Sequence, residues 1–288
     1  MREARTSRAR AAAGPRHATE FSLRNDDLVV FDLRDALARD ELLLCLALTH
    51  GRTPDFPAIA AASGYDTIYV DLEHTGTSLD IVAMLCAVAH GCGIAPLVRT
   101  PSHDGSLIAR VLDLGAAGVI VPHVSTAAEA RAVVDAARFP PYGHRSIAGP
   151  SPVSGYAAMS QPDLIATLER GTVVAVMLET PEAVGSAVEI AAVDGVDLVL
   201  IGAHDLTAEL GILGQFEDAR FTAAVEAVAR ACAEGRKAFG VAGIRPVELL
   251  RRYVGLGLRF ISAGTDAGLL AEAASARASA LRALGTGK

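Results

Sequence analysis

The chain has 288 residues, 51% of them apolar, and a formal net charge of −7. That length fits one large domain or two small ones, and so apolar a chain does not stay disordered. The longest uninterrupted apolar run covers residues 81–89, whereas a membrane-spanning helix needs about 20 residues. Aromatic residues make up only 5% of this acidic chain, which argues against a nucleic-acid surface built from basic patches and stacking rings. We therefore expect neither a membrane nor a nucleic acid as a partner.

The four cysteines show no CxxC spacing, and this pattern predicts buried thiols in a reducing cytoplasm. Residues 1–25 are rich in alanine and arginine and contain no apolar stretch of the kind that directs secretion. Glu3 and Glu20 lie within this segment and argue against a transit peptide, which is poor in acidic residues. We expect residues 1–25 to form a disordered tail and residues 26–288 to form a single domain of a cytoplasmic protein.

From Asp32 onward, short apolar runs alternate with stretches that carry the 3.6-residue apolar period of a helix. The predicted strands cover residues 42–48, 67–70, 94–98, 118–121, 173–178, 198–201, 238–241 and 259–262. The predicted helices cover residues 78–90, 106–114, 127–137, 182–192, 222–233, 246–254 and 267–284. The strands are continuously apolar, as expected for a parallel sheet that is buried on both faces.

Eight strands, each followed by a helix, within about 250 residues predict an α/β fold of the (β/α)₈ TIM barrel type. The alternative is a doubly wound open sheet, which usually shows a GxGxxG turn after its first strand. Here the first strand runs into Thr49-His50-Gly51-Arg52 without such a turn. Residues 139–160 interrupt the alternation with a long loop rich in Pro, Gly and Ser, and loops of this length are usually functional or mobile.

Polar residues follow most of the predicted strands, at the end of a barrel where active sites lie. Taken singly, Glu179 or Asp205 could be a helix cap, and His123 could be a packing residue. Because these polar residues all follow strands at the same end of the predicted barrel, together they favour an active site there. Glu179 and Asp205 follow adjacent strands, and two carboxylates completed by water suit a divalent ion such as Mg²⁺ or Mn²⁺.

Arg99 adds a fixed positive charge suited to a carboxylate or an enolate oxygen, and His74 adds a base that titrates near neutral pH. A metal ion that chelates a 2-oxo acid, together with these two residues, predicts metal-dependent aldol or retro-aldol chemistry. The only lysines are Lys237 and Lys288. Lys237 precedes the seventh strand and belongs to the opposite rim, so the sequence disfavours a Schiff-base mechanism.

From about Leu33 to its last helix, the chain resembles the HpcH/HpaI family of class II pyruvate aldolases. The segments that carry the resemblance are YVDLEH (69–74), PLVRTP (96–101), VLDLGAAGVIVPHV (111–124), RFPPYGHRS (138–146), LETPEAV (178–184), GVDLVLIGAHDLTAELG (195–211) and FISAGTDAGLL (260–270). Their order and spacing both fit the family. The resemblance implies a barrel of the phosphoenolpyruvate/pyruvate type, assembled as a homohexamer or homotrimer, with the last helix exchanged between subunits.

The resemblance also implies roles for individual residues. Glu179 and Asp205 match the metal-binding carboxylates, with Mg²⁺ or Mn²⁺ expected and Co²⁺ or Zn²⁺ as alternatives. Arg99 matches the arginine that contacts the pyruvate and enolate oxygens. His74 matches the catalytic base, and Asp113 matches the carboxylate that orients it. The turn that contains Ala203 and His204 matches the one whose backbone amides hold the pyruvate carboxylate.

Three positions depart from the family pattern. Met177 stands where a glutamine is frequent, His123 stands where many relatives have methionine, and His204 changes a turn that often reads Gly-Pro-Ala-Asp. We expect His123, together with Arg99, Ala203 and His204, to bind substrate. A histidine at the His123 position occurs in members similar to macrophomate synthase, which decarboxylates oxaloacetate.

Three functions therefore stay open. The first is a metal-dependent carbon-carbon lyase or aldolase that forms or cleaves 4-hydroxy-2-oxo acids through a metal-bound pyruvate enolate, with pyruvate or oxaloacetate and an aldehyde or other acceptor as partners. The second is an oxaloacetate-decarboxylating synthase of a specialised pathway. The third is a catalytically silent barrel used for binding or assembly.

Overall fold

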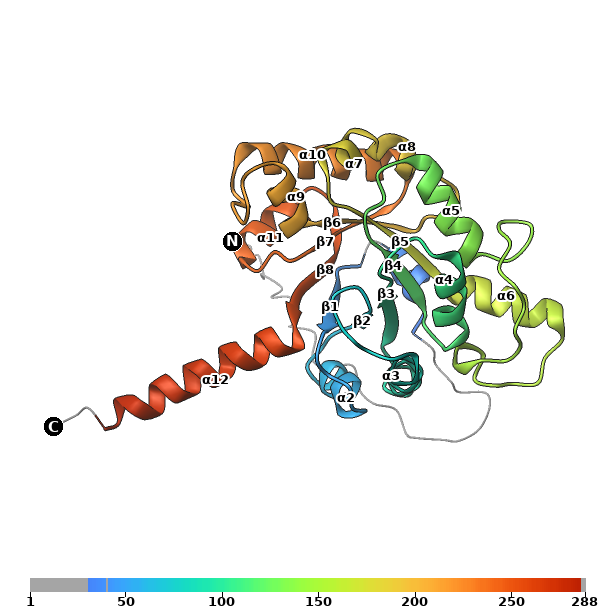
Figure 1. The fold of residues 1–288 in the computed structure, drawn as a ribbon, viewed down its shortest axis with the longest axis horizontal. Helices are drawn as coiled ribbons and strands as arrows, with labels where there is room; N and C mark the ends of the chain where they lie inside the picture. The colour runs from blue at the N-terminus through green and yellow to red at the C-terminus, as the bar shows by residue number, and fades with distance from the viewer. Residues whose placement is uncertain (1–30, 40, 286–288) are drawn as a thin grey trace, which may run out of the picture.

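The computed structural model describes residues 31–39 and 41–285, so the expected tail of residues 1–25 lies outside the described residues. Eight parallel strands form a closed barrel in which each strand pairs with the next and β8 pairs with β1 (Figure 1). The strands are β1 (Leu43–Leu48), β2 (Thr67–Asp71), β3 (Ala95–Arg99), β4 (Gly118–Val121), β5 (Val173–Leu178), β6 (Leu198–Gly202), β7 (Ala238–Ala242) and β8 (Leu258–Thr265). This confirms the predicted (β/α)₈ barrel, with strand ends within three residues of those expected.

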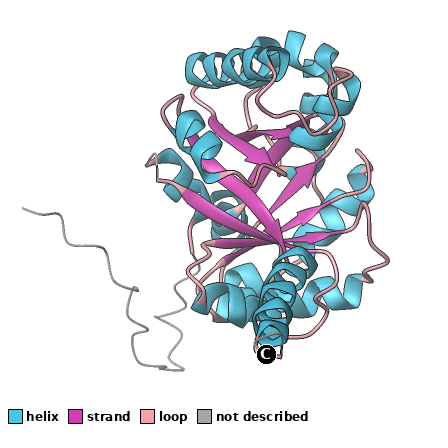
Figure 2. Ribbon diagram, turned by 90° about the vertical axis from the view of Figure 1, so that its left-hand side faces the viewer, coloured by secondary structure: helices cyan, strands magenta, loops and turns pink. Residues whose placement is uncertain are grey.

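Helices surround the barrel on the outside (Figure 2). They are α1 (Leu33–Ala38), α2 (Asp55–Ala62), α3 (Leu79–Gly91), α4 (Gly105–Asp113), α5 (Ala127–Ala137), α6 (Gln161–Gly171), α7 (Pro181–Gly185), α8 (Ala187–Ala191), α9 (Ala203–Glu209), α10 (Ala219–Gly235), α11 (Val247–Val254) and α12 (Asp266–Ala283). No bounds were predicted for α1, α2, α6 and α9. None of the described helices is long and apolar enough to cross a membrane.

The strands bury both faces because alternate side chains point to opposite sides of a strand. In β5, Val174 and Val176 belong to the core beneath the outer helices, whereas Ala175 and Met177 belong to a second core inside the barrel. Leu33 and Leu37 of α1 join this inner core beside Phe260 and Leu43. Since these residues precede or begin the barrel strands, α1 closes the amino end of the barrel, and any cavity has to open at the carboxyl end.

The predicted helix at residues 182–192 is two short helices, α7 and α8, separated at Ser186. The Ser186 hydroxyl donates to the carbonyl of Glu182 at 3.1 Å, and Gly185 before it weakens a helix interior. The apolar period continues across this break, so the sequence pattern could not reveal it. The expected long loop is confirmed between α5 and α6, with one 3₁₀ turn at Pro152–Ser154.

Helix α12 leaves the barrel and projects away from it (Figure 1). Its first residue, Asp266, is buried and accepts hydrogen bonds from the backbone N–H groups of Thr49 at 3.0 Å, His50 at 2.9 Å and Gly51. The rest of the helix is largely exposed, including Leu270. Asp266 therefore fastens the start of α12 to the loop after β1, while most of the helix has no contact with its own barrel.

Candidate active site

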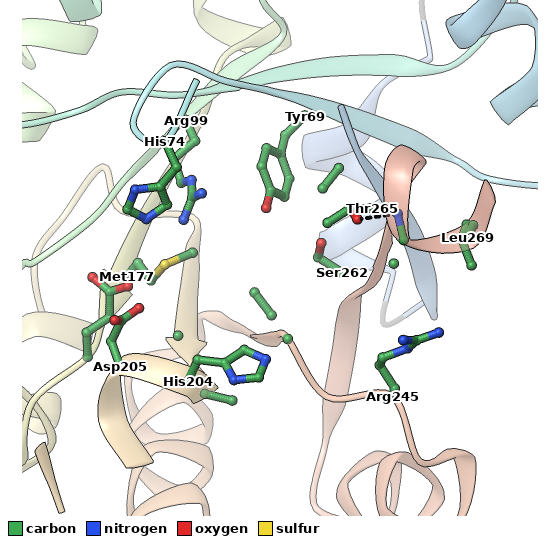
Figure 3. A pocket seen from close by; sticks show the side chains of 18 residues that line it. Tyr69, His74, Arg99, Met177, His204, Asp205, Arg245, Ser262, Thr265 and Leu269 are labelled. Carbon is green, nitrogen blue, oxygen red and sulfur yellow. Dashed lines mark hydrogen bonds between the residues drawn. The ribbon is translucent and has the colours of Figure 1, made fainter. Parts of the chain in front are cut away.

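A cavity of about 410 Å³ opens at the carboxyl ends of the strands, with lining residues from β1–β3 and β5–β8 or from the loops and helices that follow them. Six residues expected from the sequence line it: His74, Arg99, Glu179, Ala203, His204 and Asp205. Figure 3 shows His74 and Arg99 on one side of the cavity, with Asp205 and His204 along another. Tyr69 and Met177 belong to the core inside the barrel, and Ser262 is buried; all three also line the cavity. The barrel has thus brought together residues that are more than 100 positions apart.

Arg99 ends β3, and Asp71 stands directly beside it at the end of β2. The Asp71 carboxylate is fully buried and accepts two hydrogen bonds from the guanidinium, from Nε at 2.9 Å and from Nη2 at 2.8 Å. Although burial opposes the charge of Arg99, its hydrogen bonds to Asp71 help raise its pKa above the usual value. The guanidinium carbon also lies 5.5 Å from the centre of the Tyr69 ring. Arg99 is consequently a fixed cation whose planar face and direction are set by neighbours.

Glu73 connects three of the expected site residues, although the sequence had given it no role beyond the D-x-E-H segment. Its Oε2 lies 3.0 Å from Nη1 of Arg99 and 3.6 Å from Nε2 of His74, and its Oε1 lies 2.9 Å from Nε2 of His123. Oε2 is buried and accepts no hydrogen bond of good geometry from the described residues. The turn after β2 therefore supplies a buried carboxylate that lies between Arg99 and the two histidines.

Glu179 follows β5 and is almost completely buried, with 2% of its side chain exposed. Burial raises the pKa of its carboxyl to about 7, and the negative charges of Asp205 and Glu73 act in the same direction. Contacts with His123 partly offset this increase. Gly202 at the end of β6 leaves room for the carboxylate, because a Cβ at that position would lie 2.5 Å from Oε1 of Glu179.

Glu179 and Asp205 fit a divalent cation. One carboxylate is buried and costly to ionise, and the second lies near enough to raise its pKa further. A bound dication removes that repulsion, and a donor set of two carboxylates with water suits Mg²⁺ or Mn²⁺. Among residues 31–39 and 41–285, no cluster of three or more His, Cys, Asp or Glu side chains is arranged to hold a metal ion. Any ion held here would therefore take its remaining ligands from water or substrate.

His123 has a left-handed backbone, with φ of 56°, a conformation that non-glycine residues adopt infrequently. This turn directs its backbone N–H to Oε2 of Glu179 at 2.8 Å and places its ring between Glu73 and Glu179. More than half of the side chain is exposed. His123 therefore bridges two carboxylates at the edge of the site, which its position in the sequence did not reveal.

Among the contacts of the described residues, none joins Asp113 to His74. Asp113 is the last residue of α4, which runs about 13 Å from the rim that carries the site toward the amino end of the barrel. There its carboxylate pairs with Arg145 at 2.7 Å. In the described part of the chain, the His74 ring lies beside the carboxylate of Glu73, and the His74 backbone N–H faces that of Asp71. The spacing of fourteen residues after Arg99 fits the family pattern, but α4 ends toward the amino end of the barrel and places Asp113 there within its own chain.

Ala203 and His204 begin α9 at the cavity wall, as expected for residues near a bound substrate. The His204 ring lies against Gly243, where an added Cβ would lie 2.8 Å from its Cδ2. The ring also meets Phe216 edge-on, with 5.3 Å between ring centres. These two contacts place His204 on the wall shared by β6 and β7.

The fold and this site define a class of protein. The family model described as HpcH/HpaI aldolase/citrate lyase matches residues 44–273, and the chain belongs to that family. It is 42% identical over 218 residues to a 4-hydroxy-4-methyl-2-oxoglutarate aldolase of Hapsidospora irregularis, covering 74% of this chain and 80% of that protein.

Two further similarities agree with this family. The chain is 40% identical over 233 residues to a 4-hydroxy-2-oxovalerate aldolase of Novosphingobium aromaticivorans, covering 80% of this chain and 85% of the relative. A solved HpcH/HpaI aldolase from Desulfitobacterium hafniense DCB-2 superimposes with a TM-score of 0.83 at 27% identity, covering 88% of this chain and 97% of that one.

Proposed function

We propose that the protein is a divalent-metal-dependent lyase that cleaves 4-hydroxy-2-oxo acids between C3 and C4 to pyruvate and a carbonyl compound, or joins them in reverse. One observation carries this proposal: the buried Glu179, with Asp205 beside it, shares a cavity with the fixed cation Arg99. The aldolase names of the relatives support the same reaction class.

Glu179 and Asp205 would hold the ion. When bound, the ion supplies a Lewis acid that polarises the 2-oxo group. Arg99 binds and orients the 2-oxo acid, and its orientation does not depend on the substrate because Asp71 fixes it. As the C3–C4 bond breaks, its electron pair passes to the 2-oxo group, and the positive charge of Arg99 stabilises the negative charge that develops on oxygen.

His74 takes the proton of the C4 hydroxyl, which becomes the carbonyl of the departing half. Its side chain is 65% exposed and can therefore exchange that proton with solvent. The carboxylate of Glu73 lies 3.6 Å from Nε2 of His74, beside the base that takes the proton. A proton then reaches C3 to complete pyruvate. Lys237, the lysine within the described residues, immediately precedes β7 at the amino end, away from the cavity, and is not placed for a Schiff base.

Oxaloacetate decarboxylation is a second candidate. The observation that favours it is His123, whose half-exposed imidazole lies between Glu73 and Glu179 and can donate a hydrogen bond to a substrate carboxylate once it leaves one of them. Supplying oxaloacetate without an aldehyde and following pyruvate release tests this reading. Rapid turnover, with slow cleavage of 4-hydroxy-2-oxo acids, would make decarboxylation the main activity.

Metal removal tests the principal proposal. Protein stripped with EDTA should lose cleavage of 4-hydroxy-2-oxovalerate and regain it with Mn²⁺ or Mg²⁺. Glu179→Gln and Asp205→Asn should each lower kcat/KM at least about 100-fold, in the range lost when one charge-stabilising group is removed. Glu209→Gln changes an exposed carboxylate on the same helix as Asp205 and serves as the control. Full activity after EDTA treatment would overturn metal dependence, and no cleavage with any metal would favour a silent barrel.

We also propose that the active form is a homo-oligomer in which α12 packs on the barrel of a second copy. The projecting helix and its exposed leucines support this assembly, because an apolar helix gains stability only where it covers apolar surface. A hexamer or trimer, as the family resemblance implies, is compatible with it. The four cysteines are all unpaired, in keeping with our proposal of a cytoplasmic protein.

A further inference from the structure

The proposed reaction leaves open what the departing half of the substrate carries. In 4-hydroxy-4-methyl-2-oxoglutarate a second carboxylate lies beyond the broken bond, whereas 4-hydroxy-2-oxovalerate has a methyl group there. Among the described residues, the arginines that line the cavity are Arg99 and Arg245. Figure 3 shows Arg245 at the opposite end of the cavity from Arg99 and His74. The two ends of the cavity thus each present a guanidinium.

The backbone position of Arg245 is fixed by the residues on either side of it. It lies in the loop between β7 and α11, after the fully buried Ile244 and before Pro246, the N-cap residue of α11. The proline fixes its own φ, and the buried isoleucine anchors the other side. The backbone at Arg245 is therefore supported on both sides and holds this residue at the end of the cavity opposite Arg99.

The two arginines differ in how their charge is balanced. Arg99 is 11% exposed and faces the carboxylates of Asp71 and Glu73. Arg245 pairs only with Glu272 of α12 among the contacts of the described chain, and both side chains are more than half exposed. Such surface pairs contribute at most about 1 kcal/mol. A substrate carboxylate can therefore displace Glu272 from Arg245, whereas Arg99 keeps its ion pairs with Asp71 and Glu73.

The space between the arginines suits a short carbon chain. Ala47, Ala242 and Gly264 line it with small groups, and the cavity volume of about 410 Å³ exceeds what a three-carbon acid requires. His204 stands on the same side as Arg245, because its ring rests on Gly243 two residues earlier. Its imidazole adds a second donor near the guanidinium.

We propose that Arg245 binds a carboxylate on the departing half of the substrate, so that the preferred substrates are 4-hydroxy-2-oxo dicarboxylates. This inference depends on the proposed lyase function. In cleavage, the C3–C4 bond breaks, the C4 hydroxyl loses its proton and becomes a carbonyl, and C3 gains a proton. The departing half is then a carbonyl compound that itself carries a carboxylate, and Glu272 returns to Arg245 once it has left.

The test compares two substrates with the metal-loaded protein: 4-hydroxy-4-methyl-2-oxoglutarate, which yields two pyruvates, and 4-hydroxy-2-oxovalerate, which yields pyruvate and acetaldehyde. Wild-type protein should favour the dicarboxylate in kcat/KM by at least about tenfold. Arg245→Met should lower the ratio of the two kcat/KM values at least tenfold, mainly through KM for the dicarboxylate, and Arg245→Lys should restore part of it. Arg251→Met removes another exposed arginine, 71% exposed against 58% for Arg245, that pairs with Glu248 on α11 and should leave the ratio unchanged.

Glu272→Gln provides a second measurement, because it frees Arg245 without altering it. This variant should lower KM for the dicarboxylate and leave KM for the monocarboxylate unaffected. If Arg245→Met changes both substrates equally, or neither, the assignment of Arg245 is overturned while the lyase function stands. If wild-type protein cleaves neither substrate with Mn²⁺ or Mg²⁺, the proposed function itself has failed.

Discussion

His123 contacts the carboxylate of Glu179 twice, through its backbone N–H at 2.8 Å and through Nδ1 of its ring at 3.0 Å, both to Oε2. The ring reaches Glu73 with its other nitrogen at 2.9 Å. A single imidazole thereby reduces the repulsion between two buried carboxylates, and it lowers the cost of ionising Glu179. Because burial raises the pKa of the Glu179 carboxyl to about 7, its capacity to bind a cation should depend on pH.

We expect Mn²⁺ affinity to rise from pH 5 to about 7 and then level off. Glu179 has to lose its proton to bind a cation, and burial has raised the pKa of its carboxyl to about 7. His123→Ala should shift this rise to higher pH and weaken binding at pH 6 by about tenfold, a loss typical of groups that support a metal ligand. Titration calorimetry with Mn²⁺ measures both effects.

The control for His123→Ala is His144→Ala. His144 lies in the loop after α5, is 85% exposed, and pairs with Asp135 of that helix. His144→Ala should leave the Mn²⁺ curve unchanged. Affinity that is flat between pH 5 and 7 in wild-type protein would contradict a titrating Glu179, and an unshifted curve in His123→Ala would contradict the bridging role of the imidazole.

The stability of the metal-free protein should depend on Glu179 in the opposite direction. Its pKa in the folded protein lies above the ordinary value of 4.5, so the folded state binds the proton more strongly than the unfolded state. This contribution to stability is present at low pH and is lost as pH rises toward 7. Glu179→Gln stays neutral and should therefore melt at a higher temperature than wild type at pH 8, with little difference at pH 4.5. Melting curves in EDTA at both pH values decide this, and equal melting temperatures at pH 8 would speak against the buried, costly carboxylate.

The pair formed by Asp71 and Arg99 should be strongly coupled. Arg99→Leu leaves a fully buried carboxylate without its partner, which costs about 3–5 kcal/mol of stability. Asp71→Asn in the same chain removes that uncompensated charge and should recover much of the loss, although activity stays absent. Urea unfolding of the two single variants and the double variant measures the coupling. Additive effects would show that the two hydrogen bonds contribute little to folding.

Helix α12 should control assembly. Leu270→Glu places a charge on an exposed apolar position of the projecting helix, where a second copy would have to bury it, and should shift the protein to smaller species in sedimentation velocity. Leu213 lies after α9 and is exposed to a similar degree, 68% against 70%, so Leu213→Glu is the matched control. An unchanged oligomer in Leu270→Glu, or a monomeric wild type, would exclude the exchange of α12.

The amino-acid sequence alone was sufficient to predict the barrel and much of its site. Continuous apolar runs that recur with helical stretches between them require a parallel sheet with both faces covered. Once the strands are known, residues that follow adjacent strands must converge at one rim, which is how Arg99, Glu179 and Asp205 could be named together.

Other features depend on three-dimensional arrangement. The separation of Asp113 from His74 follows from the length and direction of α4, and the bridging position of His123 follows from a left-handed turn that its sequence did not signal. Glu73 and Arg245 gained roles only when burial and the cavity became visible. Periodicity reports which face of an element is apolar, whereas contacts between distant side chains depend on backbone turns and on what fills the space between them, and these are settled only when the whole chain packs.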